Sequence, residues 1–109
     1  MSAIELEDAR VDELAEMFRL MGDANRLRIL MLVLDRPRAV GEIAAAAGLS
    51  PSLVSHNLGR LRVSRLVRAE RRGKQVFYVA ADQHVRTVLQ DMLEHIAEVD
   101  LPRPLAGPS

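Results

Sequence analysis

The stretch AVGEIAAAAGLSPSLVSHNLGRLRVSRLV, residues 39–67, predicts two short helices joined by a tight turn. Apolar residues recur at helical spacing over residues 40–47, and Gly48 follows where a left-handed residue commonly ends a helix. Ser50 is a favoured N-cap residue, and proline opens the next stretch at the first helical position, so a second helix is predicted over residues 51–64. Two short helices joined in this way are typical of a helix-turn-helix.

Two further helices are predicted before this unit. Residues 5–21 and 24–34 each carry apolar side chains at helical spacing. Asp23 is a suitable N-cap for the second of them. Pro37 prevents that helix from continuing, because proline has no backbone N–H to donate and its ring clashes with the preceding turn.

A β-hairpin and a long helix are predicted after the unit. The stretch LVRAERRGKQVFYVA, residues 66–80, alternates like a strand on both sides of a turn at residues 73–74, which predicts a hairpin with basic residues near its tip. Residues 82–98, DQHVRTVLQDMLEHIAE, predict one amphipathic helix with Asp82 as its N-cap. The expected fold class is therefore mainly α with a β-hairpin wing, a winged helix-turn-helix.

Composition limits the class of protein further. The chain has 109 residues and is 49% hydrophobic, so we expect one domain over residues 1–100, followed by a flexible, proline- and glycine-rich tail over residues 101–109. The absence of cysteine excludes disulfides and thiolate metal sites. No apolar run is long enough to cross a bilayer, and the acidic start MSAIELEDAR lacks the features of a signal peptide, so a cytoplasmic location is expected.

The charges are unevenly distributed although the formal net charge is +0. Residues 4–16 contain six acids and one base, whereas residues 60–74 contain seven bases and one acid. A run of charge is usually a solvated face. Seven bases within fifteen residues exceed what such a face usually shows, and they favour a polyanionic partner.

The candidate DNA-binding residues follow from this order of elements, because the second helix of a helix-turn-helix enters the major groove. Short or planar polar groups on that helix suit base edges, while arginines suit phosphates or guanine. Taken singly, these polar residues would equally suit a solvated helix, so the order of the elements carries the prediction. The candidates are Ser50, Ser52, Ser55, His56, Asn57, Arg60 and Arg62 in the helix unit, and Arg71, Arg72 and Lys74 in the hairpin.

Three motifs resemble those of the ArsR/SmtB family of bacterial winged-helix repressors. They are FRLMGDANRLRILMLV, EIAAAAGLSPSLVSHNLGRLR and LVRAERRGKQVFYVA, and together with the last helix they cover most of residues 15–98. The resemblance implies a homodimer, formed through the N- and C-terminal helices, that binds double-stranded operator DNA. It also implies repression of a nearby gene until an inducer releases the protein, and it implies no enzymatic activity.

The last predicted helix carries half of a metal site at each end. His84 and His95 are eleven residues apart, so they point the same way but lie about 16 Å apart along the axis, too far to share one ion. Two copies packed antiparallel would bring Asp82 and His84 of one chain to His95 and Glu98 of the other, giving two equivalent sites per dimer. The alternative is a dimerising helix with incidental histidines. The expected seam is Val85, Val88, Leu89, Met92, Leu93 and Ile96.

The same spacing resembles that of the zinc- and cobalt-responsive members of the family, which implies that Asp82, His84, His95 and Glu98 are metal ligands. Nitrogen and oxygen donors without thiolate suit Zn(II), with Co(II) as a second inducer. The alternative is a repressor of the same fold that responds to a non-metal signal or to another metal such as Ni(II). A zinc hydrolase and a protein-binding winged helix are less favoured readings, the first because no general base accompanies the ligands.

Overall fold

The helix-turn-helix is present in the computed structural model, which describes residues 7–100, with side chains to residue 98. Helix α3 (Val40–Ala47) ends at Gly48, whose φ of 69° lies in the left-handed region that glycine adopts without strain. Helix α4 (Pro51–Val63) begins after Ser50, whose hydroxyl accepts the N–H of Leu53 at 3.1 Å. Both predicted caps are confirmed.

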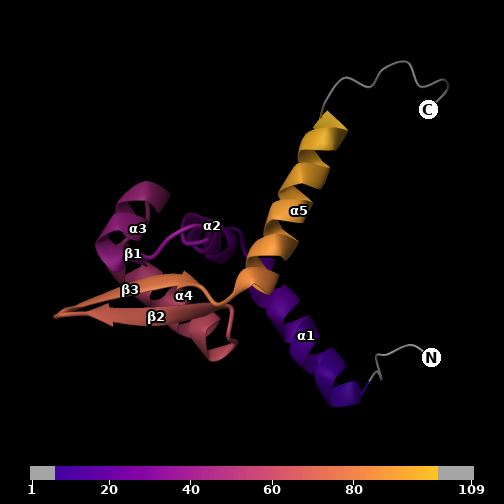
Figure 1. The fold of residues 1–109 in the computed structure, drawn as a ribbon, viewed down its shortest axis with the longest axis horizontal. Coiled ribbons are helices and arrows are strands. Elements are labelled where there is room, and N and C mark those ends of the chain that lie inside the picture. Colours follow the sequence, from indigo (N-terminus) through magenta and orange to yellow (C-terminus); the bar gives the residue numbers. More distant parts are fainter. Residues whose placement is uncertain (1–6, 101–109) are drawn as a thin grey trace.

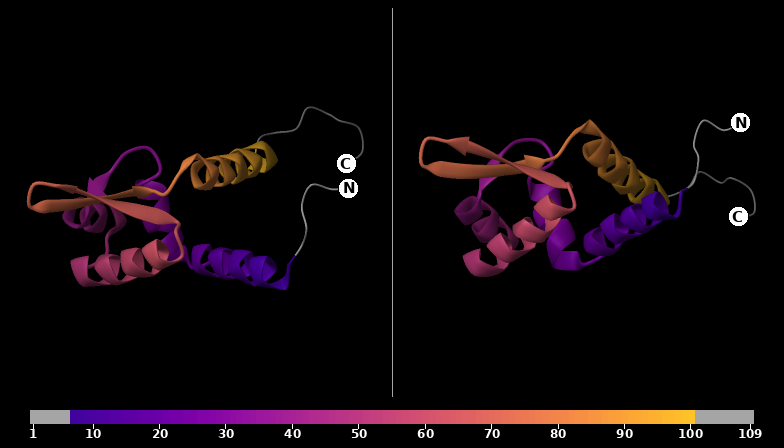
Figure 2. Two further views of the ribbon diagram at one scale, coloured as in Figure 1. Left: turned by 60° about the horizontal axis from the view of Figure 1, so that its bottom comes forward. Right: turned by 90° about the horizontal axis from the view of Figure 1, so that it is seen from below.

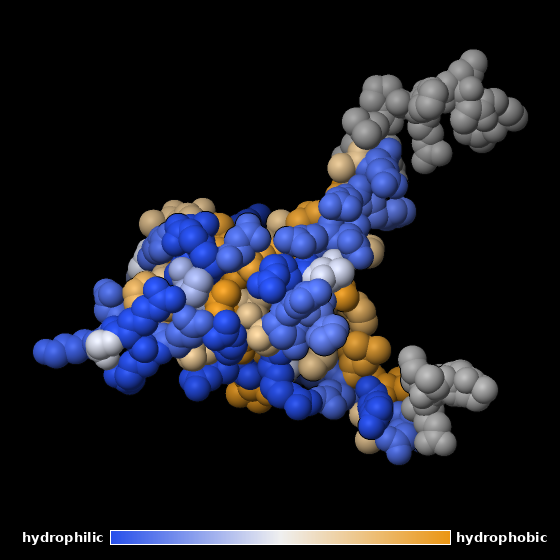
Figure 3. All heavy atoms as spheres, in the orientation of Figure 1, coloured by the Kyte–Doolittle hydropathy of each residue, from blue (hydrophilic) through white to orange (hydrophobic). Residues whose placement is uncertain are grey.

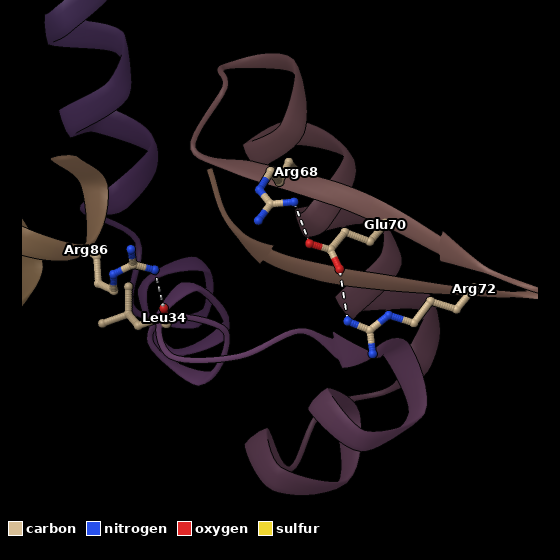
Figure 4. Close-up of polar contacts among 5 residues, drawn as sticks. All are labelled: Leu34, Arg68, Glu70, Arg72 and Arg86. Carbon is tan, nitrogen blue, oxygen red and sulfur yellow. Dashed lines mark hydrogen bonds and ion pairs between the residues drawn. The ribbon is translucent and has the colours of Figure 1, made fainter. Parts of the chain in front are cut away.

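Helices α1 (Asp8–Met21) and α2 (Ala24–Leu32) precede this unit, and the Asp23 carboxylate caps α2 by accepting the N–H of Arg26 at 3.0 Å. Helix α2 ends at Leu32, two residues before the predicted end at about residue 34. The next two carbonyls bond to distant parts of the chain: that of Val33 accepts the N–H of Ala80 at 2.9 Å, and that of Leu34 accepts Arg86 Nη1 at 3.4 Å (Figure 4).

A three-stranded antiparallel sheet forms the wing, with strand order β1-β3-β2. The predicted hairpin is confirmed as β2 (Val67–Arg72) and β3 (Gln75–Ala80), joined by a turn at Gly73 with φ of 62°. Strand β1 (Arg38–Ala39) was not predicted, since two residues carry no readable alternation. It lies on the other side of β3 and joins α2 to α3 along the sheet edge.

Helix α5 (Gln83–Asp100) follows the sheet and is capped by Asp82, as predicted. Figures 1 and 2 show that α1 and α5 extend from the core on the side opposite to the tip of the hairpin. Figure 3 shows hydrophilic residues over the hairpin and apolar residues where α1 and α5 leave the core. No helix in residues 7–100 has the length and apolar character needed to cross a membrane.

The hydrophobic core lies between α2, α3, α4 and the sheet. Its largest fully buried side chains are Ile29, Leu30, Val33, Ile43, Val54, Leu58, Leu61 and Val67. Because α4 contributes three of them, the opposite face of α4 is left to solvent. The mainly α fold with a hairpin wing is confirmed. Residues 1–6 and the predicted tail over residues 101–109 lie outside the described part of the chain.

Candidate functional site

The exposed face of α4 carries most of the predicted DNA-reading side chains. Ser52, Ser55, His56 and Arg62 are exposed, and Arg60 is partly exposed. Ser50 is exposed at the start of the helix, where its hydroxyl is already used by the cap. A shallow open groove follows this face beside α1, and its lining residues are Glu16, Leu20, Ser55, His56, Gly59, Arg60, Val63 and Ser64.

The placement of Asn57 on the exposed face of α4 is wrong. Its side chain is 4% exposed, and Asn57 Nδ2 donates to the carbonyl of Leu53 at 3.1 Å. The spacing explains the error: Asn57 lies one turn after Val54 and one turn before Leu61, both of which are buried. A polar residue between two core positions of a helix faces the core, so Asn57 satisfies its amide internally.

In the wing, the predicted basic residues differ in their surroundings. Arg71 and Lys74 are exposed and form no ion pair within the described part of the chain. Arg72 Nη2 instead donates to Glu70 Oε1 at 3.1 Å, and its guanidinium lies 5.1 Å from the centroid of the Phe77 ring. Arg68 Nη1 donates to the other carboxylate oxygen of Glu70 (Figure 4).

The hydrogen bonds from Arg68 and Arg72 lower the pKa of Glu70, so this carboxylate is ionised at neutral pH. Neither Glu70 nor Arg68 was among the residues singled out from the sequence. The signal that would have found them is the alternation Arg-x-Glu-x-Arg over residues 68–72 in a predicted strand, because alternate residues of a strand share one face.

Two of the predicted metal ligands lie together at the start of α5. Asp82 Oδ1 accepts the backbone N–H groups of His84 at 2.9 Å and Val85 at 3.2 Å. These bonds, the one from Val85 foremost, lower the pKa of Asp82 and keep it ionised. The His84 side chain is 94% exposed, with Nδ1 at 3.6 Å from Asp82 Oδ1. An ionised carboxylate beside an exposed imidazole is a donor pair that fits Zn(II) or Co(II).

The other two predicted ligands, His95 and Glu98, are exposed near the far end of α5. In residues 7–98 of one chain, no three side chains of metal-binding type come together. One chain therefore places the four residues as two separate pairs, and it does not by itself bring the pairs to one point.

The start of α5 is bonded to the end of α4. The carbonyl of Leu66 accepts the N–H of Ala81 at 3.0 Å, and the N–H of Leu66 donates to the carbonyl of Leu61 at 2.9 Å. The second bond, with that of the Arg65 N–H to the Arg62 carbonyl at 2.9 Å, forms a Schellman cap on α4. Arg65 occupies its left-handed position with φ of 61° and ion-pairs with Glu13 of α1.

Comparisons with known proteins agree with this arrangement. Residues 23–69 match the model of the family described as "Bacterial regulatory protein, arsR family". The chain is 36% identical over 91 residues to the "Transcriptional repressor SmtB homolog" of Synechocystis sp., covering 84% of this chain and 69% of that protein. The chain belongs to the ArsR/SmtB family. It is a transcriptional repressor of the ArsR/SmtB type and not an enzyme.

Solved structures show the same fold as this ArsR/SmtB repressor. The homodimeric winged helix-turn-helix DNA-binding domain Mb0332 of Mycobacterium bovis is 30% identical, with a TM-score of 0.74 and coverage of 94% of both chains. The antimony-specific transcriptional repressor AntR is also 30% identical, with a TM-score of 0.76 and coverage of 92% of both chains.

The ArsR/SmtB repressor leaves an apolar surface uncovered on α1 and α5. We call this surface the α1/α5 face, and its side chains are between 40% and 56% exposed. Its members are Val11, Leu14 and Phe18 of α1, and Val88, Met92, Leu93 and Ile96 of α5. Val85 and Leu89, which were predicted for the seam, pack against the core of their own chain instead. A pocket of about 190 Å³ lies between the two helices and is lined mainly by apolar residues.

Proposed function

We propose that this protein is a homodimeric repressor that binds operator DNA and is released by Zn(II) or Co(II). The ions would be held at two intersubunit sites, each formed by Asp82 and His84 of one protomer with His95 and Glu98 of the other. The observation that carries the proposal is the distribution of these donors: two exposed pairs at opposite ends of one helix, separated by an exposed apolar stripe.

The DNA-binding part rests on the exposed face of α4 and on the wing. Ser52, Ser55 and His56 offer hydrogen-bonding groups for base edges, and Arg60 and Arg62 extend the same helix toward phosphates. Arg71 and Lys74 add exposed positive charge at the tip of the wing. Mb0332, which has the same fold, is described as a homodimeric DNA-binding domain.

The exposed α1/α5 face is the basis for proposing a dimer. Seven large apolar side chains with more than a third of their surface in solvent form a larger patch than single exposed residues normally do, and such patches mark interaction sites. Packing α5 against a second α5 in the antiparallel sense would cover this stripe. The same packing brings the His84 end of one helix to the His95 end of the other, because the separation of about 16 Å is then matched in both copies.

The choice of metal rests on the donors that the chain can offer. AntR is described as antimony-specific, and a soft ion of that kind favours thiolate ligands. This chain contains no cysteine, so its donors are imidazole nitrogens and carboxylate oxygens. Two of each per site suit a tetrahedral Zn(II) or Co(II). When bound, the ion supplies a bond between the protomers.

The coupling between the two sites follows from the contacts around Leu66. Asp82 and His84 directly follow Ala81, whose N–H donates to the Leu66 carbonyl, and Leu66 in turn closes the end of α4. These two hydrogen bonds give a displacement of the start of α5 a direct route to the end of α4. By linkage, DNA must weaken metal binding by the same factor by which the metal weakens DNA binding.

The test is an operator titration of the purified dimer by fluorescence anisotropy, with Zn(II) and separately with Co(II). We expect release at one metal per subunit. The variant His95→Gln should bind operator in the absence of metal within about twofold of the wild type, because surface substitutions cost little, yet it should not respond to metal. Glu94→Gln, an exposed neighbour on α5, is the matched control and should respond normally.

Two outcomes would contradict the proposal. Release of the His95→Gln variant by metal would show that the ligands are assigned wrongly. If the wild type binds the operator tightly and neither metal releases it, the protein remains a repressor but Zn(II) and Co(II) are not its inducers. The inducer would then be a non-metal signal or another metal such as Ni(II).

A further inference from the structure

The alternation of charge along β2 places three ionic side chains on one face of the wing. Arg68, Glu70 and Arg72 stand at alternate positions of β2, so they project from the same side of the strand. Glu70 uses one carboxylate oxygen for each arginine. Its side chain is 26% exposed, against 55% for Arg68 and 60% for Arg72. We call these three residues the Glu70 clamp.

Arg72 is held by a second contact as well. Its guanidinium lies over the ring of Phe77, which is the cross-strand partner of Glu70. The ring and the carboxylate together hold the guanidinium in place. Figure 4 shows the Arg72 guanidinium directed toward the Glu70 carboxylate, on whose other side Arg68 lies. Because the hydrogen bonds lower the pKa of Glu70, this carboxylate keeps its negative charge at neutral pH.

Arg71 and Lys74 stand apart from the clamp. Arg71 lies between Glu70 and Arg72 in sequence and therefore projects from the opposite face of β2, where it is exposed. Lys74 follows Gly73 in the turn and is also exposed. Of the four bases in the β2–β3 hairpin, these two are the ones that form no ion pair with a described carboxylate.

We propose that Glu70 is a positioning residue that withholds Arg68 and Arg72 from DNA phosphates, so that the wing contacts DNA through Arg71 and Lys74. This inference rests on the proposed DNA-binding function. Its consequence concerns selectivity: phosphate contacts supply nearly all of the affinity for non-specific DNA. Because Glu70 holds both arginines and offsets one of their two positive charges, it lowers that background without removing a proposed base contact on α4.

The experiment measures the salt dependence of binding by the full-length dimer to an operator duplex and to a scrambled duplex of equal length. Glu70→Gln keeps the shape of the side chain and removes its charge. It should tighten binding to both duplexes by roughly tenfold at ~0.1 M salt. It should also steepen the slope of log K against log salt by about one to four, since up to two arginines per protomer are released and each phosphate contact contributes ~0.9.

Arg72→Gln and Arg71→Gln separate a positioning role from a merely structural one. In the wild-type background, Arg71→Gln should make the slope shallower, whereas Arg72→Gln should leave it nearly unchanged. In the Glu70→Gln background, Arg72→Gln should make the slope shallower as well, because its guanidinium is then free. Far-UV circular dichroism of each variant checks that the wing remains folded, and Glu70→Ala repeats the charge removal with a different side chain.

The inference is overturned if both charge-removing variants bind DNA no more tightly than the wild type, or if Arg72→Gln alone reduces the slope as much as Arg71→Gln does. In both cases the wild-type protein still binds its operator, so the result contradicts the role of Glu70 and not the proposed DNA-binding function. A wild-type protein that binds neither duplex would instead overturn the proposed function, and this inference with it.

Discussion

Replacement of the buried Asn57 by alanine should lower stability and leave DNA reading intact. The variant loses the hydrogen bond from Asn57 Nδ2 to the Leu53 carbonyl, which contributes a net free energy of about 1 kcal/mol. It also loses part of a side chain that is 4% exposed, which adds to the cost. The better helix propensity of alanine returns roughly 0.5 kcal/mol. We expect the free energy of unfolding to fall by about 1 kcal/mol per protomer.

Urea denaturation followed by far-UV circular dichroism measures this loss, at one fixed protomer concentration because the stability of a dimer depends on it. Anisotropy measurements on operator and scrambled duplexes should show an unchanged preference for the operator. Ser55→Ala is the matched control on the exposed face of α4: it should leave the urea midpoint unchanged and reduce the operator preference. An Asn57→Ala variant of full stability that no longer distinguishes the two duplexes would refute the assignment of Asn57 to the core.

Two further predictions concern the cap of α4 and the dimer. Because Arg65 has φ of 61°, Arg65→Gly should have a free energy of unfolding about 1 kcal/mol higher than that of Arg65→Ala, and should therefore unfold at a higher urea concentration. Both variants lose the ion pair with Glu13, so that loss cancels in the comparison. Equal midpoints would contradict the left-handed cap. Met92→Glu should be monomeric by sedimentation velocity, because it places a charge in the α1/α5 face, whereas the exposed Gln90→Glu should remain dimeric. A dimeric Met92→Glu variant would place the interface elsewhere.

Features of the fold that depend on nearby residues were predictable from the sequence. The caps at Asp23, Ser50 and Asp82 and the turn at Gly48 each use a side chain or a backbone preference within a few residues, and all four are confirmed. The end of α2 and the strand β1 were not predictable, since both are decided by bonds to β3 and α5, 38 to 52 residues later in the chain.

The DNA-binding residues and the metal ligands were predictable from the sequence to different degrees. Exposure of Ser52, Ser55 and His56 follows from the buried stripe of α4, and the same stripe should have excluded Asn57. The clamp around Glu70 was missed because charges were counted along the chain rather than by strand face. The metal-ligand assignment stays a prediction, because it depends on how a second α5 packs against the first.

The hairpin leaves the body of the protein and returns to it at one point: Val67 pairs with Ala80, and the flanking Leu66 and Ala81 are joined by a hydrogen bond. The two ends are therefore fixed to each other independently of what lies between them. Residues added in pairs at the Gly73 turn would lengthen the reach of the wing along the duplex without moving α4 relative to α5. During evolution, such a protein can change how far its wing extends while the contact that joins the end of α4 to the start of α5 stays the same.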